Sequence, residues 1–511
     1  MNAPWPPPGL PRRFAPRLAR WVTTASLACA GIVAPAGLVP IDTVRANPAL
    51  ETLGGLGTSH PFTARLMGTG AETAYFNPAL LPYVDEGFSI GFFLLSDQLD
   101  VSLAPRPAGA DVTDAIYKAW QKDAEGVQHP LSFRPLPTAT LGERDSRDEG
   151  KMRSYINVGF VKRIIKERCV VGLMAVLPTS TFQEQTSRFA DEREQFFSNG
   201  LAHELYGDRL GMMTVTLGFG GVITDWLSWG AGFTLGLSTS TVNPVYVPDA
   251  ANQREILITT DTGVDTTFAP HFSVTVTPSD RVRLAATLHT ASKSETRGTN
   301  RLKFWNYKYE EGEDAIVQTF KFVNGYEPLT IGSGASLRFP NADGSAWAVG
   351  TELRWRAWSD YVDRSGKHPD VAWSDTVSAS LGGRYESAGT SVHVDLGWTP
   401  SPVPNQGGAE NYVDEDRIGV SAGLETDLDL LGVKLRGAIG LQVHRLIPRQ
   451  TKKSDTAAFP VRDEFPDDAF DVFTGESFPD AVGLQTNNPG WPGWSSSGWL
   501  LGAGVSVKVG L

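Results

Sequence analysis

His393 and Asp395 are the best candidate pair for acid–base chemistry in this chain of 511 residues. They are two positions apart, so in an extended strand both side chains point to the same face. A hydrolase would also need a nucleophile beside the histidine. The sequence has no nucleophile motif, no phosphate-binding loop and no His-Glu-x-x-His zinc motif. We therefore expect no enzyme activity, no cofactor and no bound metal.

Cysteine content and net charge exclude two further classes of protein. Cys29 and Cys169 are the two cysteines of the chain, and Cys29 lies in an N-terminal leader described below, so a thiolate metal cluster is excluded. The formal net charge is -12, and residues 1–46 carry five Arg and one Asp, a net of +4. The remainder therefore carries -12 - 4 = -16, which argues against nucleic acid as a partner.

The elements that position these residues are predicted by alternation of apolar and polar side chains with a period of two. For example, Val392, Val394 and Leu396 alternate with His393 and Asp395. The same pattern predicts fourteen strands, at 88–104 (interrupted), 153–163, 169–177, 211–222, 228–241, 268–277, 281–291, 331–339, 346–358, 376–386, 390–398, 418–427, 432–445 and 498–511.

Three features favour a transmembrane barrel over a soluble β-sandwich. Many strands have ten or more residues, whereas a membrane strand needs about 9–11. Trp and Tyr stand at strand ends, as in an interfacial aromatic girdle. Long connections, among them 105–152 and 446–497, alternate with short turns, as in barrels of the outer membrane. We predict an all-β fold, a 14-stranded antiparallel barrel.

In such a barrel, charged residues on the polar face must point into the lumen, because a charge on the lipid face costs roughly 2–4 kcal/mol at mid-membrane. The simplest interpretation of these charged residues is that they form a structural network of salt bridges. These predicted lumen residues are Glu352, Arg354, Arg356, Arg384, Glu386, His393 and Asp395.

The chain before the first strand divides into two parts. Basic residues, an apolar stretch and Val44-Arg45-Ala46 predict a signal peptide at 1–46, cleaved after Ala46. Residues 47–86 are rich in Gly but contain aromatic and aliphatic side chains, which favours a plug inside the barrel. Residues 87–511 then form the barrel.

Three short motifs occur in order along the chain. The first is Gly68–Leu81, GTGAETAYFNPALL, which contains Asn77-Pro78-Ala79. The second is Trp355–Ser359, WRAWS, and the third combines Ser401–Pro404, SPVP, with Asp414–Arg417, DEDR. In these motifs and their order the chain resembles FadL-type outer-membrane transporters of fatty acids and aromatic hydrocarbons. The resemblance covers essentially the whole chain after the leader, although the chain ends in Leu511 where the family usually has an aromatic residue.

The resemblance implies a monomeric barrel in the outer membrane of a Gram-negative-type bacterium, in contact with lipid and lipopolysaccharide and inserted by the barrel-assembly machinery. It implies passive uptake of long-chain fatty acids or similar lipids and hydrocarbons, with lateral exit through the wall.

We expect Asn77-Pro78-Ala79 to hold the plug. Gly172 is the candidate for a distortion of the wall. The candidate ligand-lining residues are Phe62, Phe76 and Leu80. A cation among the lumen residues could meet a ligand carboxylate. A lipid hydrolase and a general porin remain as alternatives.

Overall fold

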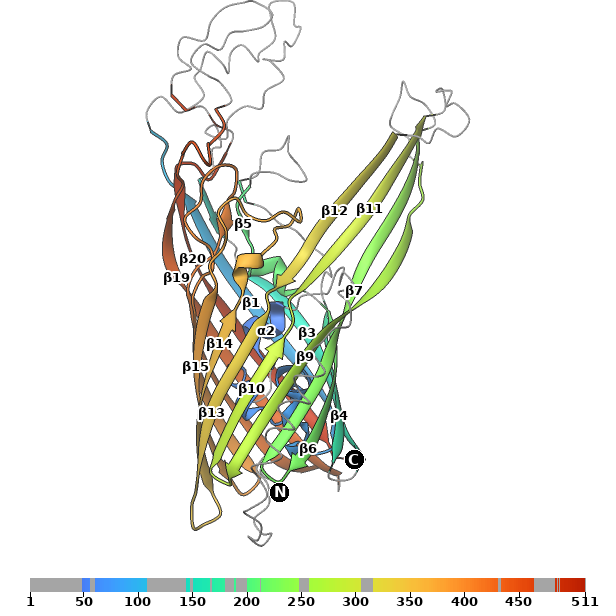
Figure 1. The fold of residues 1–511 in the computed structure, drawn as a ribbon, viewed down its shortest axis with the longest axis vertical. Helices are drawn as coiled ribbons and strands as arrows, with labels where there is room; N and C mark the ends of the chain where they lie inside the picture. The colour runs from blue at the N-terminus through green and yellow to red at the C-terminus, as the bar shows by residue number, and fades with distance from the viewer. Residues whose placement is uncertain are drawn as a thin grey trace, which may run out of the picture.

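The computed structural model describes residues 48–55, 60–107, 144–147, 150–165, 168–179, 188–189, 200–211, 213–247, 257–304, 316–430, 433–463, 483–484, 486 and 488–510. Across these residues, fourteen antiparallel strands form one closed barrel (Figure 1). In their order around the wall they are β1 (Gly87–Leu103), β3 (Lys151–Ile165), β4 (Cys169–Pro178), β6 (Thr214–Thr224), β7 (Leu227–Val247), β9 (Asp261–Ser279), β10 (Val282–His289), β13 (Thr330–Pro340), β14 (Ala346–Arg356), β15 (Thr376–Ser387), β16 (Thr390–Thr399), β18 (Arg417–Leu430), β19 (Val433–Lys452) and β20 (Gly493–Val509).

The barrel is closed by the pairing of β20 with β1, which runs from Phe88 opposite Val509 to Leu103 opposite Trp494. Each of the fourteen predicted strands overlaps one observed strand, so the predicted strand number and antiparallel order are confirmed. The first strand, predicted as interrupted, is continuous. Short and long connections alternate, which defines a short-turn end and a long-loop end of the barrel (Figure 1).

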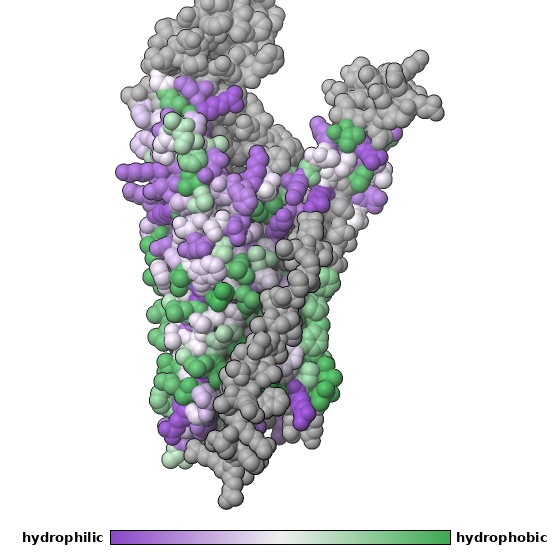
Figure 2. Space-filling model, viewed as in Figure 1, coloured by the Kyte–Doolittle hydropathy of each residue, from purple (hydrophilic) through white to green (hydrophobic). Residues whose placement is uncertain are grey.

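The outward face of the wall is apolar and the inward face is polar over much of the ring. Leu353 and Val394 on the outside are 50% and 52% exposed, whereas the neighbouring Arg354 and Asp395 are 6% and 0% exposed. Hydrophobic side chains cover the visible lower wall, and hydrophilic ones gather above it (Figure 2). This is the arrangement that a surrounding lipid bilayer requires.

An arm of paired strands extends from the long-loop end (Figure 1). Two of its strands continue from the barrel wall, β7 and β9, which have 21 and 19 residues, well beyond the length that a membrane crossing needs. The arm is completed by β11 (Ser292–Phe304), parallel to β7, and β12 (Ile316–Glu327), antiparallel to β11. β11 and β12 lie between the strands predicted at 281–291 and 331–339, where no strand was predicted. The segment SKSETRGTNRLKF of β11 is polar and lacks apolar alternation, so the period-two pattern did not reveal it.

The remaining short elements lie inside the ring or at its long-loop end. They are α2 (Pro48–Leu53), α3 (Ala64–Met67), α4 (Thr73–Phe76), η2 (Pro78–Tyr83), β2 (Asp145–Arg147), β5 (Ala202–His203), η4 (Gly207–Leu210), β8 (Leu257–Ile258), η5 (Trp358–Asp360) and β17 (Tyr412–Val413). Among the described residues, no helix is long and apolar enough to cross a membrane. The predicted signal peptide, residues 1–46, lies outside the described part of the chain.

Candidate functional site in the barrel lumen

The described residues before β1 lie within the ring of strands (Figure 1). We call residues 48–55 and 60–86 the N-terminal segment. Its η2 helix packs against β4, β6, β7 and β9, and its α3 helix packs against β10, β13 and β14. Every residue of α3 and α4 is buried. Contacts with strands on different sides of the ring place the segment inside the lumen.

Wall glycines allow the segment to lie directly on the inner face of β4, β6 and β7. A β-carbon on Gly172 would come within 2.5 Å of the Leu81 side chain, and one on Gly218 within 2.7 Å of the Ala74 carbonyl oxygen. A β-carbon on Gly220 would overlap the Pro78 carbonyl. A larger residue at Gly218 or Gly220 would push the segment away from the wall, because the nearest atoms there belong to the backbone.

Gly172 was expected to distort the wall, and the strand pairing places the irregularity elsewhere. The ladders of β4 with β3 and with β6 run through Gly172 without a shift, and the register shift of β3 against β4 lies between Arg163 and Ile165. The physical reason is that Gly172 faces the lumen, where its missing side chain makes room for Leu81. We therefore assign this glycine to packing of the segment.

Asn77 joins two parts of the N-terminal segment to each other and to the barrel wall. Its side-chain amide donates to the Arg65 carbonyl at 2.6 Å and to Thr275 Oγ1 on β9 at 3.1 Å. Its side-chain oxygen accepts from the Ala79 backbone N–H at 3.1 Å. The same N–H donates to Ser273 Oγ at 2.9 Å. Asn77 is completely buried and extended, as the residue before a proline tends to be.

Replacing Asn77 and Pro78 with alanine is expected to loosen the segment while the barrel still folds. The double variant leaves the Arg65 carbonyl and Thr275 without their partner, and each buried unsatisfied group costs about 1–3 kcal/mol. Planar-bilayer conductance and antibiotic sensitivity should rise. Asn341→Ala is the matched control, because Asn341 bonds to Ser345 in an exposed turn. A folded double variant with the conductance of Asn341→Ala would show that the motif is only a turn.

A first group of predicted lumen residues surrounds Glu51 of α2. Arg356 Nη2 lies 3.1 Å and Arg354 Nη1 3.6 Å from Glu51 Oε2, while Arg65 contacts both Glu51 and Glu352. All five side chains are buried. The arginine guanidinium groups are thus already paired with carboxylates of the protein itself. This geometry favours a structural network of salt bridges over a site for a ligand carboxylate.

A second group surrounds Asp395 on β16. His60 Nδ1 lies 2.9 Å from Asp395 Oδ1, and the Phe62 backbone N–H donates to Oδ2 at 3.1 Å. The Thr63 hydroxyl donates to the same carboxylate at 3.2 Å. His393, the expected partner of Asp395, lies with its ring centroid 4.8 Å from that of His60, and the two rings are tilted by 40°. Asp395 therefore holds the N-terminal segment.

The other two predicted lumen residues form a separate pair near the short-turn end. Arg384 Nε lies 2.9 Å from Glu386 Oε1, and Arg384 Nη2 lies 3.8 Å from Glu425. The fold thus divides the predicted set into three ionic groups. In two of them the partner is a residue of the N-terminal segment.

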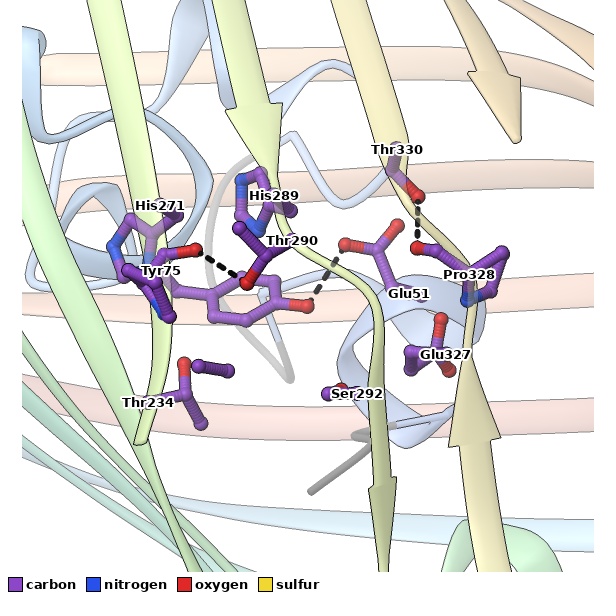
Figure 3. Close-up of a pocket in the computed structure, with 12 residues that line it drawn as sticks. Glu51, Tyr75, Thr234, His271, His289, Thr290, Ser292, Glu327, Pro328 and Thr330 are labelled. Atoms are coloured by element: carbon purple, nitrogen blue, oxygen red, sulfur yellow. Dashed lines mark hydrogen bonds between the residues drawn. The ribbon is translucent and has the colours of Figure 1, made fainter. Parts of the chain in front are cut away.

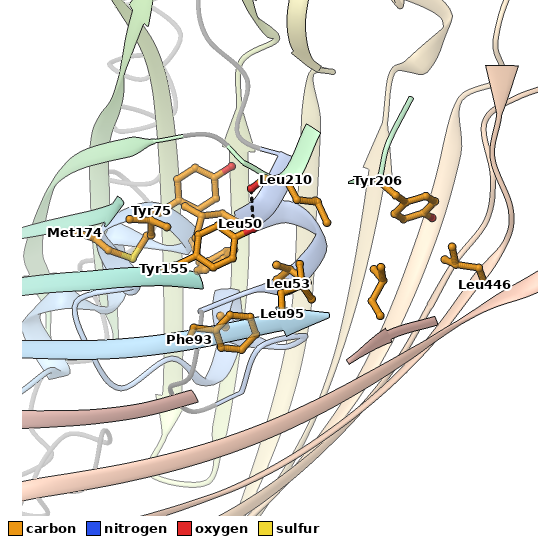
Figure 4. Close-up of a cluster of buried hydrophobic side chains, with 14 of the residues drawn as sticks. Leu50, Leu53, Tyr75, Phe93, Leu95, Tyr155, Met174, Tyr206, Leu210 and Leu446 are labelled. Atoms are coloured by element: carbon orange, nitrogen blue, oxygen red, sulfur yellow. Dashed lines mark hydrogen bonds between the residues drawn. The ribbon is translucent and has the colours of Figure 1, made fainter. Parts of the chain in front are cut away.

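An apolar cluster fills the part of the lumen beside β1, β3 and β4 (Figure 4). It consists of Leu50, Leu53, Ala64, Tyr75, Phe76, Phe93, Leu95, Leu99, Tyr155, Met174, Val176, Tyr206, Leu210, Leu446 and Leu500. Of the three predicted ligand-lining residues, Phe76 belongs to this cluster. Phe62 instead packs edge-on against the His444 ring, and Leu80 is buried in η2.

The wall residues of this cluster were not among the residues predicted from the sequence. Phe93, Leu95 and Leu99 are inward-facing residues of β1, a strand that is also apolar on its outward face at Phe88 and Phe92. A strand that is apolar on both faces breaks the rule of a polar lumen. That pattern in residues 88–95 was the available signal for an apolar interior surface.

Several cavities border the N-terminal segment, and one of them is polar. It measures about 350 Å³ and lies between α2, α4 and the inner ends of the arm strands (Figure 3). Here the Tyr75 hydroxyl donates to Glu51 at 2.9 Å, and the rings of His271 and His289 stack with centroids 5.0 Å apart. Glu327 also lines this space. Its lining suits water and polar groups.

The larger cavity, of about 710 Å³, lies at the short-turn end. We call it the floor cavity. Residues 69–72 of the segment form one side, and inward-facing residues of β1, β3, β4, β18, β19 and β20 form the other. Met174 and Val176 belong both to its lining and to the apolar cluster. The apolar cluster and the floor cavity therefore adjoin at these two residues of β4.

Loops at the long-loop end meet above the apolar cluster. β5 pairs with β17, and Tyr206 and Leu210 of the β4–β6 loop reach the cluster. Burial alone would raise the pKa of Glu204, but Arg209 and Arg364, at 2.6 and 3.0 Å, and the Tyr361 hydroxyl lower this pKa to about 2. An ionised Glu204 thus fixes these loops to one another. We call this group of loops the outer cap.

Comparison with known proteins identifies the fold. A solved Pseudomonas aeruginosa FadL homologue matches 92% of this chain and 99% of its own, with a TM-score of 0.50 and 12% identity. The chain has the FadL fold. The Pseudomonas putida toluene transporter TodX matches 88% of this chain and 97% of its own, with a TM-score of 0.42 and 12% identity. No protein-family model and no curated protein matches the sequence. The FadL fold confirms the resemblance seen in the motifs at the level of architecture.

Proposed function

We propose that this protein is a bacterial outer-membrane channel for passive uptake of hydrophobic compounds. The proposed ligands are long-chain fatty acids, similar lipids or hydrocarbons. The observation that carries the proposal is the apolar cluster, which runs inside the barrel from the outer cap to the floor cavity. Lipopolysaccharide hinders hydrophobic solutes, and an apolar path enclosed by the barrel avoids that barrier.

Under this proposal residues 1–46 are a cleaved signal peptide and residues 47–86 are a plug. The hydrogen bonds of Asn77 to Thr275 and of Phe62 to Asp395 support the plug, because they join the segment to the barrel wall. The barrel acts as a monomer in contact with lipid and lipopolysaccharide after insertion by the barrel-assembly machinery. N-terminal sequencing of the mature protein should begin at Asn47, and a mature protein that begins at Met1 would contradict the cleavage.

Uptake by a deletion strain tests the function. Cells that lack this gene should take up labelled oleate or toluene more slowly than the parent, and the intact gene should restore the rate. Equal rates in parent and deletion strain for both probes would refute the proposal. Faster sugar uptake on overexpression would favour a general porin, although the segment inside the lumen argues against a wide aqueous pore. A lipid hydrolase finds no support at Asp395, which bonds to the segment.

The proposed route out of the lumen is lateral exit through the wall into the membrane, as the resemblance implies.

A further inference from the structure

We propose that the outer cap is a proton-operated closure, held shut only while the neighbouring side chains of Asp414 and Glu415 are uncharged. A rise in external pH ionises these two carboxyl groups and opens the cap above the apolar cluster. This inference concerns the regulation of the proposed channel and so rests on the proposed function, but its test follows the cap itself and not uptake.

Asp414 and Glu415 lie where two loops of the outer cap meet. Immediately before them, β17 pairs in parallel with β5 of the β4–β6 loop. Tyr206, which belongs to the apolar cluster, donates through its hydroxyl to the backbone carbonyl oxygen of Glu415 at 3.4 Å. A movement of these two residues therefore disturbs both the pairing of the loops and the contact of the cap with the cluster.

Both carboxyl groups are removed from water, since Asp414 is 3% exposed and Glu415 is 0% exposed. The Ser401 hydroxyl donates to Asp414 Oδ2, but Asp414 Oδ1 and both carboxyl oxygens of Glu415 make no hydrogen bond of good geometry with the described part of the chain. His203 Nε2 lies 3.9 Å from Glu415 Oε1, beyond hydrogen-bond distance. Burial without such bonds strongly disfavours a charge, so the closed cap favours the neutral acids.

The arginines next to Asp414 do not offset its burial. Burial raises the pKa of Asp414 to about 7, against the opposing effects of the Ser401 hydroxyl, Arg449 and Arg417. Arg449 is engaged by backbone carbonyl oxygens of the same loop, those of Asp414 at 3.2 Å and Val403 at 2.5 Å. Arg417 lies over the Tyr206 ring, 6.0 Å from its centroid. Both guanidinium groups thus hold other parts of the cap.

Glu415 has an even stronger preference for the neutral form. Burial and the neighbouring Asp414 raise the pKa of Glu415 to about 8. His203 adds no positive charge at neutral pH, because burial lowers its own pKa to about 3. The groups that act in the opposite direction have smaller effects, and they are Ser496, Arg449 and Arg188.

The direction of the pH effect follows from these shifts. In an open cap the two side chains meet water, where their pKa values are about 3.9 and 4.3. Opening therefore releases protons, and it becomes more favourable as the pH rises through the values of the closed cap. The increase ends above about pH 8, where both groups are ionised in either state. Since one pKa unit corresponds to a factor of about ten, the open fraction should rise at least about tenfold between pH 6 and pH 8.5.

The accessibility of Leu210 to a maleimide reports opening of the cap. Leu210 belongs to the loop that carries Tyr206 and is completely buried. Leu210→Cys is placed in a chain that lacks Cys29 and Cys169, and the barrel is purified in detergent. Ala342→Cys, in an exposed turn, is the reference, because the ratio of the two labelling rates removes the effect of pH on the thiol itself.

This ratio should rise at least about tenfold from pH 6 to pH 8.5 in the parent background. Combining Asp414→Asn with Glu415→Gln should keep the ratio low at both pH values, because the amides cannot ionise. Asp416→Asn is the matched control and should keep the pH dependence. Asp416 is a half-buried carboxylate of the same loop, and its Oδ1 already accepts from the Ser401 backbone N–H at 2.8 Å.

A ratio that stays constant with pH in the parent background would overturn the inference. So would a pH dependence that persists in the folded double variant, which would assign it to another cap residue such as Glu410 or Lys453, whose pKa values burial brings to about 7. If the double variant does not fold, the two single variants replace it, and an undiminished pH dependence in both refutes the closure. Failure of the proposed function is seen separately, as equal uptake by parent and deletion strain.

Discussion

Glu51→Gln is expected to release the N-terminal segment and to raise the conductance of the barrel more than any other single change to an ionic side chain. The substitution keeps the size of the side chain but removes the carboxylate that Arg65, Arg354 and Arg356 share. Removing one partner of a buried ion pair costs roughly 3–5 kcal/mol, because the remaining charges stay buried. Planar-bilayer conductance should rise, and the thermal unfolding midpoint should fall.

The matched control for Glu51 is Glu86→Gln. Glu86 pairs with Lys162 at 2.9 Å, but both side chains are partly in solvent, so this pair is worth about 0–1 kcal/mol. Combining Glu51→Gln with Arg356→Gln should restore part of the stability, since it removes one of the uncompensated charges. Conductance and unfolding of Glu51→Gln that match Glu86→Gln would show that this ionic group does not hold the segment.

Gly230→Ala is expected to displace the N-terminal segment from the wall by steric overlap alone. An added β-carbon would overlap the backbone at Pro78 and Ala79, and backbone atoms cannot rotate away as a flexible side chain can. Overpacking of this kind costs roughly 1–3 kcal/mol. The expected result is a folded barrel with raised conductance and faster proteolysis within residues 60–86.

Gly383→Ala provides the control for Gly230. Its β-carbon would have the Val394 carbonyl oxygen, at 3.9 Å, as its nearest neighbour, which is an ordinary contact. Gly383→Ala should therefore behave as the parent in both assays. If Gly230→Ala also behaves as the parent, the segment adapts to the wall at this point and the glycines are not required for its position.

The strands could be predicted from the sequence because the membrane imposes a strict rule on each of them. Lipid outside and a polar lumen inside make residues such as Leu353 and Arg354 alternate, and this local pattern needs no knowledge of the neighbours. Where the surroundings differ, the rule fails. β11 lies in the arm and carries no apolar alternation, so this strand was not predicted. β1 faces an apolar interior, and the inner face of this strand was not interpreted from the sequence.

The position of the lumen charges could be predicted, but not their partners. Alternation places Asp395 inside the barrel, whereas its bond to His60 joins residues 335 apart in the sequence. The four-residue helices α3 and α4 are too short to be stable alone, and contacts with the wall hold them in place. Such contacts depend on the complete ring, and no local pattern encodes them.

The unbroken seam between β20 and β1 also limits the order of assembly. The N-terminal segment continues directly into β1, yet its bonding partners lie on β9, β14 and β16, which are synthesised much later. A closed ring offers no sideways route for a folded helix. The segment must therefore be inside when the seam forms, or enter afterwards from an open end. Closure of the first strand onto the last is thus the step that decides whether a newly inserted barrel contains the N-terminal segment or has an open lumen.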